Sequence, residues 1–300
     1  MRISTIPRLS APKLAAAGAS LAIAGTLLGA GIASAATAAT TASATTAASH
    51  ATSSRANSAV KPTIVLVHGA WADNSSWNAV VERLQARGYT VDVPPNPLRG
   101  VTDDANYLSD FLSTISGPII LVGHSYGGFV ITQAATGNAQ VKALVYDDAF
   151  IPAAGDSPFS LSGAEPGSCL AVADPTTVLN FAPFPKATDG DADTYVKPSV
   201  FPGCFANGLP AREGEALAAE QQPLAASTLK ETLTVAPAWQ TIPSWAVIGT
   251  ADHVIPPAEQ VIMAHRAGSH ITEIKAPHLS MISDPGAVTQ VILDAARATS

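Results

Sequence analysis

The fold is decided by the stretch Ile119-Ile120-Leu121-Val122-Gly123-His124-Ser125-Tyr126-Gly127-Gly128. A short apolar run, rich in β-branched residues, leads directly into a Gly-x-Ser-x-Gly pattern, and apolar residues then return at helical spacing. This order predicts a buried strand, a very tight turn and a helix. Because glycine has no Cβ atom to collide in such a turn, the serine hydroxyl can be held exposed at the edge of a sheet. Ser125 is therefore the candidate nucleophile.

Composition limits the class of partner. The chain has 300 residues, of which 47% are hydrophobic and 13% charged, and its net charge is −7. Without its N-terminal region it keeps about 240 residues, enough for one large domain. The mild acidity, with no Lys/Arg-rich run, argues against nucleic acid or anionic lipid as a partner. We expect a small-molecule substrate instead.

The first 35 residues have the pattern of a signal peptide. A positively charged start precedes the chargeless run 14–32, and Ala33-Ser34-Ala35 offers a cleavage site before Ala36. An uncleaved membrane anchor is the alternative, because the run is almost long enough to span a bilayer. Both interpretations predict export, and cleavage predicts a secreted, extracellular protein with no stable membrane association.

Residues 36–60 are almost entirely Ala, Thr and Ser. Such a stretch cannot bury enough apolar surface to offset the entropy lost on ordering, so we expect a disordered leader. The folded domain is then expected to span residues 61–300.

The chain has two cysteines, Cys169 and Cys204. In an exported protein an isolated pair favours a disulfide, which here would close a loop of about 35 residues and contribute roughly 3–4 kcal/mol. Two unrelated buried thiols are the alternative. No second Cys or His stands at ligand spacing, so we expect no metal site and no cofactor.

Strands and helices alternate along the rest of the chain. Strands are expected at residues 63–67, 89–93, 119–122, 141–146, 244–249 and 271–275, each followed by a helical pattern or a polar turn. Thr102 and Asp103 are candidates to cap the second helix. Alternation of this kind predicts a mostly parallel α/β sheet with helices on both faces. Between residues 152 and 240 prolines interrupt the alternation, and we expect an inserted cap there.

Ligands of such sheets bind beyond the carboxyl ends of the strands. A serine hydroxyl needs a base there, and the base needs an orienting carboxylate. Of the seven histidines, His278 directly follows the last predicted strand and is the candidate base. His253 is the alternative and more naturally lines the rim, whereas His124 lies inside the turn, where its side chain should point away from the serine.

Two positions compete for the acid. Asp252 ends the strand before His278 and gives the chain order Ser, Asp, His expected for this architecture. Asp147 and Asp148 end an earlier strand, and an acid there can also reach the histidine. We prefer Asp252 and keep the pair as the alternative.

An acyl-transfer site also needs two N–H donors for the oxyanion of its tetrahedral intermediate. The residue after the nucleophile, Tyr126, supplies one, and the loop after the first strand supplies the other, most plausibly at Ala70. The alternative is that His68-Gly69 is only a tight turn.

With these residues in place, the chain resembles the α/β-hydrolase superfamily from about residue 61 to residue 300, except in the cap. Val-Leu-Val-His-Gly-Ala-Trp at 65–71 and Pro-His-Leu-Ser-Met-Ile at 277–282 look like the salicylate-esterase and hydroxynitrile-lyase branch. The resemblance implies Ser125 as nucleophile, His278 as base, Asp252 as acid, and the Ala70 and Tyr126 N–H groups as oxyanion hole. It also implies a mostly helical cap over an apolar pocket.

Departures from the family pattern favour an esterase. Lyases of this branch carry a lysine directly after the catalytic histidine, and here that residue is Leu279. A related dehalogenase would have aspartate at position 125. Perhydrolase activity and a receptor-like binder with slow hydrolysis stay as alternatives.

The substrate expected is a small or medium hydrophobic carboxylic ester, because pockets of this kind are mostly apolar. Lactones, amides and polyesters remain open. The candidates for the pocket wall are Trp71, Phe150, Phe159, Phe181, Phe184 and Trp239.

Overall fold

A six-stranded parallel sheet forms the centre of the fold, with the strand order β2-β1-β3-β4-β8-β9. The computed structural model describes residues 60–299, so the predicted signal peptide and nearly all of the predicted leader lie outside the described residues. The strands are β1 (Thr63–Val67), β2 (Val91–Asp92), β3 (Ile119–His124), β4 (Val141–Asp147), β8 (Ser244–Gly249) and β9 (His270–Ile274). The predicted parallel α/β sheet is confirmed, although β2 is shorter than expected.

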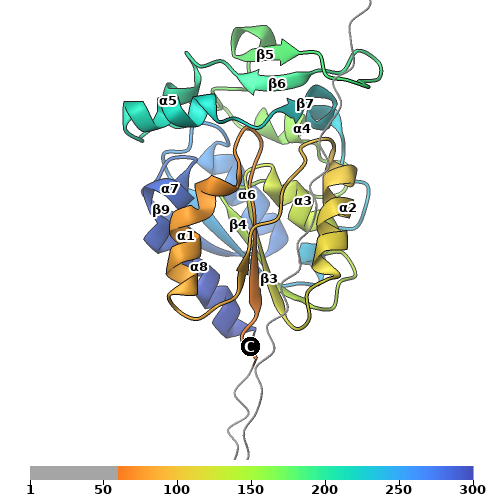
Figure 1. Ribbon diagram of the computed structural model, residues 1–300, viewed down its shortest axis with the longest axis vertical. Helices are drawn as coiled ribbons and strands as arrows, with labels where there is room; N and C mark the ends of the chain where they lie inside the picture. The colour runs from red at the N-terminus through yellow and green to blue at the C-terminus, as the bar shows by residue number, and fades with distance from the viewer. Residues whose placement is uncertain (1–59, 300) are drawn as a thin grey trace, which may run out of the picture. The chain divides into compact units, whose positions relative to one another are not determined.

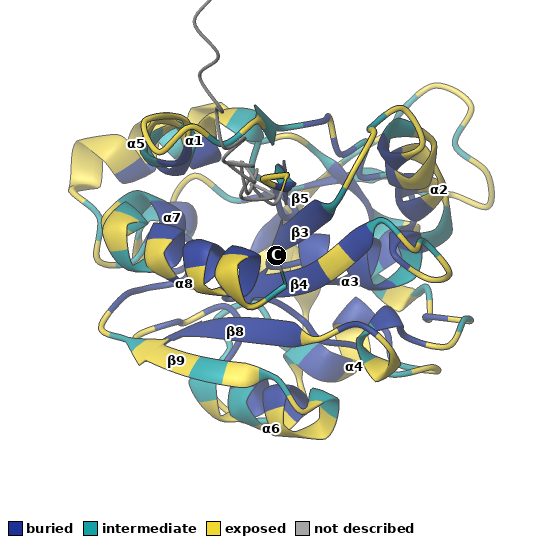
Figure 2. Ribbon diagram, turned by 90° about the horizontal axis from the view of Figure 1, so that it is seen from below, coloured by how far each residue is buried: buried dark blue, intermediate teal, exposed yellow. Residues whose placement is uncertain are grey.

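The middle of the sheet is buried on both faces. Every residue of β3 and β8 is buried, and in β4 only Lys142 is exposed. Continuous runs of Ile, Leu and Val suit strands covered by helices on both sides. Figure 2 shows these strands in dark blue, whereas β9 at the sheet edge is largely exposed.

Helices cover the two faces of the sheet. In Figures 1 and 2, α1 (Asn78–Gln85) and α8 (Pro285–Ala298) lie on one face, and α2 (Val101–Leu112), α3 (Gly127–Ala134) and α6 (Pro257–Ala267) lie on the other. The 3-10 turn η1 (Asn74–Trp77) leads into α1, and the one-turn α7 (Ser280–Ser283) precedes α8.

The start of α2 differs from the prediction. Neither Thr102 nor Asp103 caps this helix, since both lie inside it. The Glu231 carboxylate accepts hydrogen bonds from the N–H groups of Val101 (2.7 Å) and Thr102 (2.9 Å) instead. A negative charge is favourable at a helix N-terminus, where N–H groups have no partner within the helix. The cap thus comes from a residue more than a hundred positions away, which local sequence cannot reveal.

The insertion between β4 and β8, here called the cap (residues 152–240), lies at one end of the sheet (Figure 1). It contains two short α-helices, α4 (Pro158–Ser162) and α5 (Ala211–Ala219), and an antiparallel sheet of β5 (Leu179–Ala182), β6 (Asp193–Val196) and β7 (Leu224–Ala225). Its 3-10 turns are η2 (Pro175–Thr177), η3 (Phe201–Gly203), η4 (Ala226–Lys230) and η5 (Ala238–Gln240). The expectation of a mostly helical cap is therefore wrong, because the cap also contains an antiparallel sheet. The strands of this sheet have only two to four residues, too few for a recognisable alternation of apolar and polar side chains in the sequence.

The cap is fastened both internally and to the rest of the fold. Cys169 and Cys204 form a disulfide, with their Cα atoms 5.8 Å apart. Arg99, in the loop before α2, pairs with Asp193 of β6 at 2.6 Å and also donates to the Pro223 carbonyl. Among residues 60–299, no helix is long and apolar enough to cross a membrane.

Candidate active site

Ser125 lies where β3 turns into α3, at a sharply bent point of the backbone. Its φ angle is +52°, in the left-handed region that non-glycine residues seldom adopt. The bend is held by hydrogen bonds from the N–H groups of Gly128 (3.0 Å) and Phe150 (3.2 Å) to the Ser125 carbonyl. It also needs a glycine at 128, because a Cβ atom there would lie 2.0 Å from the Phe150 carbonyl oxygen. The strain at one residue is thus maintained by the contacts around it.

Ser125, His278 and Asp252 form a continuous chain of hydrogen bonds. The Ser125 hydroxyl donates to His278 Nε2 (3.1 Å), and His278 Nδ1–H donates to Asp252 Oδ2 (2.8 Å). An ionised carboxylate can only accept hydrogen bonds, so the imidazole proton is held at Nδ1 and the Nε2 lone pair faces the serine. The arrangement can take a proton from the hydroxyl and keep the resulting imidazolium beside a negative charge.

The Asp252 carboxylate has further donors around it. Its Oδ1 accepts from the N–H groups of Val254 (2.7 Å) and Ile255 (3.0 Å), and its Oδ2 accepts from Gln260 Nε2 (2.8 Å). These donors fix the position of the buried carboxylate beside His278.

Asp147 and Asp148, the alternative acids, make no hydrogen bond with His278. Asp147 Oδ1 accepts from Ser280 Oγ (2.7 Å), and Asp148 Oδ1 accepts from the Gly249 N–H (2.5 Å). Burial raises the pKa of Asp147 to about 7 and raises the pKa of Asp148 well above its ordinary value. The geometry therefore favours Asp252 as the partner of the histidine.

The other histidines near the turn do not reach Ser125. His124 Nε2–H donates to the His278 carbonyl (2.9 Å), and burial holds the pKa of His124 well below its ordinary value. A neutral His124 thus supports the backbone of the histidine that contacts the serine. His253 is exposed, and its carbonyl accepts from the Cys169 N–H (2.8 Å) of the cap.

Two N–H groups beside Ser125 are free to bind an oxyanion. Ala70 and Tyr126 line the same cavity as Ser125, and within residues 60–299 their N–H groups donate to no acceptor. The loop after β1 that carries Ala70, here called the Ala70 loop, packs directly against the nucleophile, since a Cβ atom on Gly69 would lie 2.7 Å from Ser125 Cβ. His68 holds this loop, because its Nδ1–H donates to the Gly69 carbonyl (2.9 Å).

Ser125 opens into a cavity of about 400 Å³ under the cap. The predicted wall residues Trp71, Phe150 and Phe159 line it, but Trp239 does not. The Trp239 indole N–H donates to the Pro152 carbonyl (2.8 Å), so the prediction for this residue is wrong. Phe181 and Phe184 are also outside this cavity: Phe181 lines a neighbouring groove, and Phe184 packs against the Arg99 guanidinium.

The Alpha/beta hydrolase family matches residues 64–291, which is most of the chain. The chain belongs to this family.

Curated relatives of this α/β-hydrolase match part of its length. It is 38% identical over 112 residues to the carbendazim hydrolyzing esterase of Nocardioides sp. (strain SG-4G), covering 32% of this chain and 46% of that protein. It is 36% identical over 107 residues to the pyrethroid hydrolase of Sphingobium wenxiniae, covering 32% of this chain and 38% of that protein. The chain thus spans less than half the length of these relatives.

The structure of polyneuridine aldehyde esterase has the same fold. It superposes with a TM-score of 0.67 at 18% identity, over 78% of this chain and 99% of that protein. At this level of identity the likeness concerns the fold alone.

One residue that positions the site of this α/β-hydrolase, Asp104, is not predicted by the sequence. The Tyr126 hydroxyl donates to Asp104 Oδ2 (2.7 Å), and the Arg99 N–H donates to Asp104 Oδ1 (3.0 Å). Asp104 is fully buried, and burial raises its pKa to about 6. This acid on α2 fixes the residue that follows the nucleophile. No local pattern signals it, because Asp104 occupies an ordinary position in a helix.

Trp71 also links the Ala70 loop to the cap. Its indole N–H donates to the Thr194 carbonyl of β6 (3.0 Å), and its φ angle is +55°. Its ring meets Phe205 edge-on at 6.1 Å, and Phe205 in turn meets His278 edge-on at 5.0 Å. The loop, the cap and the histidine therefore pack as one unit.

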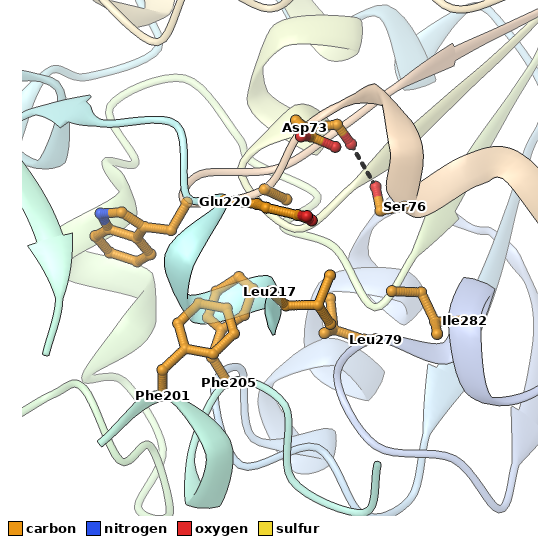
Figure 3. A pocket seen from close by; sticks show the side chains of 10 residues that line it. Asp73, Ser76, Phe201, Phe205, Leu217, Glu220, Leu279 and Ile282 are labelled. Atoms are coloured by element: carbon orange, nitrogen blue, oxygen red, sulfur yellow. Dashed lines mark hydrogen bonds between the residues drawn. The ribbon is translucent and has the colours of Figure 1, made fainter. Parts of the chain in front are cut away.

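A second hollow beside Trp71 is too small for a substrate. Figure 3 shows the apolar side chains of Phe205, Leu217 and Leu279 on one side of it and the polar Asp73 and Ser76 on the other. Its volume is about 20 Å³, and a water molecule needs roughly 10–15 Å³ measured in this way. It can hold a water molecule but not an ester.

The buried Asp147 gives a prediction for stability against pH. Its pKa rises on folding from 3.8 to about 7, so its contribution to stability is full below pH 3.8 and is lost as the pH rises through 7. Asp147→Asn removes this loss. Between pH 5 and pH 8 the free energy of unfolding should fall less in the variant than in the wild type, by on the order of 2 kcal/mol.

Urea denaturation at both pH values measures this difference. Asp110→Asn, an exposed acid on α2, is the matched control and should leave the pH dependence unchanged. Equal falls in wild type and Asp147→Asn would show that Asp147 does not ionise in this range.

Proposed function

We propose that the protein is a serine esterase that hydrolyses hydrophobic carboxylic esters through an acyl-enzyme. The observation that carries this proposal is the chain of hydrogen bonds from Ser125 through His278 to Asp252, at the mouth of a cavity with two unused N–H donors. Two relatives that match over part of their length, a carbendazim hydrolyzing esterase and a pyrethroid hydrolase, support the same chemistry.

The first half of the reaction forms the acyl-enzyme. Ser125 Oγ attacks the ester carbonyl while His278 Nε2 takes its proton, and Asp252 stabilises the imidazolium. The negative charge on the carbonyl oxygen is held by the N–H groups of Ala70 and Tyr126. As the C–O bond breaks, His278 returns the proton to the leaving alcohol.

The second half regenerates the serine. Water attacks the acyl carbonyl, His278 takes one of its protons, and the carboxylic acid leaves as Ser125 Oγ recovers a proton from His278. Water supplies all the atoms that are added, so the reaction needs no cofactor.

Leu279 weighs against the hydroxynitrile-lyase alternative. This residue occupies the position of the lyase lysine, but its side chain is only 2% exposed and lines the small hollow with Phe201 and Phe205. It offers no cation to a developing cyanide. A lyase would release cyanide from mandelonitrile, and we expect none.

Ser125→Ala should lower kcat/KM for p-nitrophenyl butyrate by about 10⁴-fold or more, because the nucleophile is lost. Asp252→Asn should lower kcat by about 10⁴-fold, because an amide no longer holds the proton at His278 Nδ1. Steady-state kinetics and labelling with a fluorophosphonate measure both effects.

Two variants serve as controls for these substitutions. Ser113→Ala changes an exposed serine at the end of α2 and should keep full activity. Asp147→Asn changes the competing acid and should cause a far smaller loss than Asp252→Asn. Retained turnover in Ser125→Ala, or a larger loss in Asp147→Asn than in Asp252→Asn, would refute the assignment.

Export is part of the proposed function. It is supported by the predicted signal peptide and by the Cys169–Cys204 disulfide, since disulfides persist mainly outside the cytosol. Amino-terminal sequencing of the protein from the culture medium should find a chain that starts at Ala36. Full-length protein retained in the cells would contradict the proposal.

A further inference from the structure

A groove on the surface of the cap lies next to the cavity that contains Ser125. Its volume is about 480 Å³, comparable with the cavity itself. It runs between the β5–β6 loop and η4, and its own lining includes Phe181, Thr188, Asp189, Gly190, Ser227 and Lys230.

The cavity and the groove share part of their walls. Four residues line both: Phe159, Pro175, Leu179 and Leu229. They come from α4, η2, β5 and η4, so the outer wall of the cavity is also the inner wall of the groove. All four are apolar, so the boundary between the two spaces offers an apolar chain packing contacts and no side-chain hydrogen bonds.

Two exposed aromatic side chains mark the groove. The large hydrophobic residues that are exposed within residues 60–299 number five, and two of them, Phe159 (62%) and Phe181 (45%), line this groove. Exposed apolar surface gathered in one concave place, rather than scattered, is typical of a binding site.

Hydrogen bonds hold the side of the groove that lies away from the cavity. The Asp191 carboxylate ties the β5–β6 loop to η4 by accepting from the Ser227 N–H (2.9 Å) and the Ser227 hydroxyl (2.7 Å). These hydrogen bonds hold the loop in place opposite η4, and the Phe181 ring offers the groove's largest exposed apolar surface apart from Phe159.

We propose that the groove is an outer subsite for extended hydrophobic esters, whose apolar chain leaves the cavity past Leu229 and lies against Phe181. The proposal rests on the proposed function, since the cavity is taken to hold the ester group at Ser125. It replaces the small or medium ester expected from the sequence with an ester that has a long apolar chain on one side of the reacting bond.

The test compares long and short esters of the same leaving group. Phe181→Ala should lower the ratio of kcat/KM for p-nitrophenyl dodecanoate to that for p-nitrophenyl butyrate about tenfold, through KM, because the groove contacts only the distal chain. Phe181→Leu, which keeps an apolar side chain, should restore most of the ratio. Hydrolysis of dodecyl acetate, compared with butyl acetate, shows whether a long alcohol chain uses the same groove.

Tyr107→Ala is the matched control. Tyr107 is an aromatic residue on α2 with the same exposed fraction as Phe181, 45%, and it lies outside the cavity and the groove. It should leave the ratio of long to short esters unchanged. An unchanged ratio for both acyl and alcohol chains in Phe181→Ala, or an equal fall in Tyr107→Ala, overturns the proposal.

A measurement of binding affinity distinguishes a failure of the proposed subsite from a failure of the proposed esterase activity. In the Ser125→Ala background, the Kd for dodecanoic acid, measured by calorimetry, should rise about tenfold with Phe181→Ala and stay constant with Tyr107→Ala. If no ester is hydrolysed but this difference is found, the proposed function fails and the subsite stands. If esters are hydrolysed but the Kd is the same in all variants, the subsite fails and the esterase stands.

Discussion

The bend at Ser125 is the constraint on which the rest of the structure depends. A non-glycine residue with φ of +52° is stable only where the surroundings hold it, and here Gly128 packs against the Phe150 carbonyl while Gly69 packs against the serine itself. The same close packing brings the Ala70 loop beside the nucleophile. One tight turn therefore places both the hydroxyl and the N–H groups that would bind an oxyanion.

The three buried acids near this turn differ in the number of hydrogen bonds that their carboxylates accept. Asp252 is buried, and it accepts three hydrogen bonds besides that from His278. Asp147 and Asp148 are equally buried but each has one carboxylate oxygen with no hydrogen-bond partner, and burial favours their neutral forms. A single ionised carboxylate close to His278 gives the imidazole one preferred proton position.

Features that depend on local pattern could be predicted from the sequence. The apolar strands, the turn at Ser125 and the positions of Asp252 and His278 at strand ends follow from periodicity and from the geometry of parallel sheets. Features that depend on distant contacts could not. Glu231 capping α2 and Asp104 binding the Tyr126 hydroxyl are single contacts across the fold. The prediction for Trp239 is wrong because the sequence around an aromatic residue in a proline-rich segment does not show which way its ring points.

The central claim is that Ser125 carries the acyl group during turnover. Mixing the protein with excess p-nitrophenyl butyrate, quenching with acid within milliseconds and mapping the peptides by mass spectrometry tests it directly. We expect one butyryl group per chain, on the hydroxyl of Ser125 and absent from the Ser125→Ala variant. A butyryl group on another side chain, or turnover with no acylated peptide at any quench time, would contradict it.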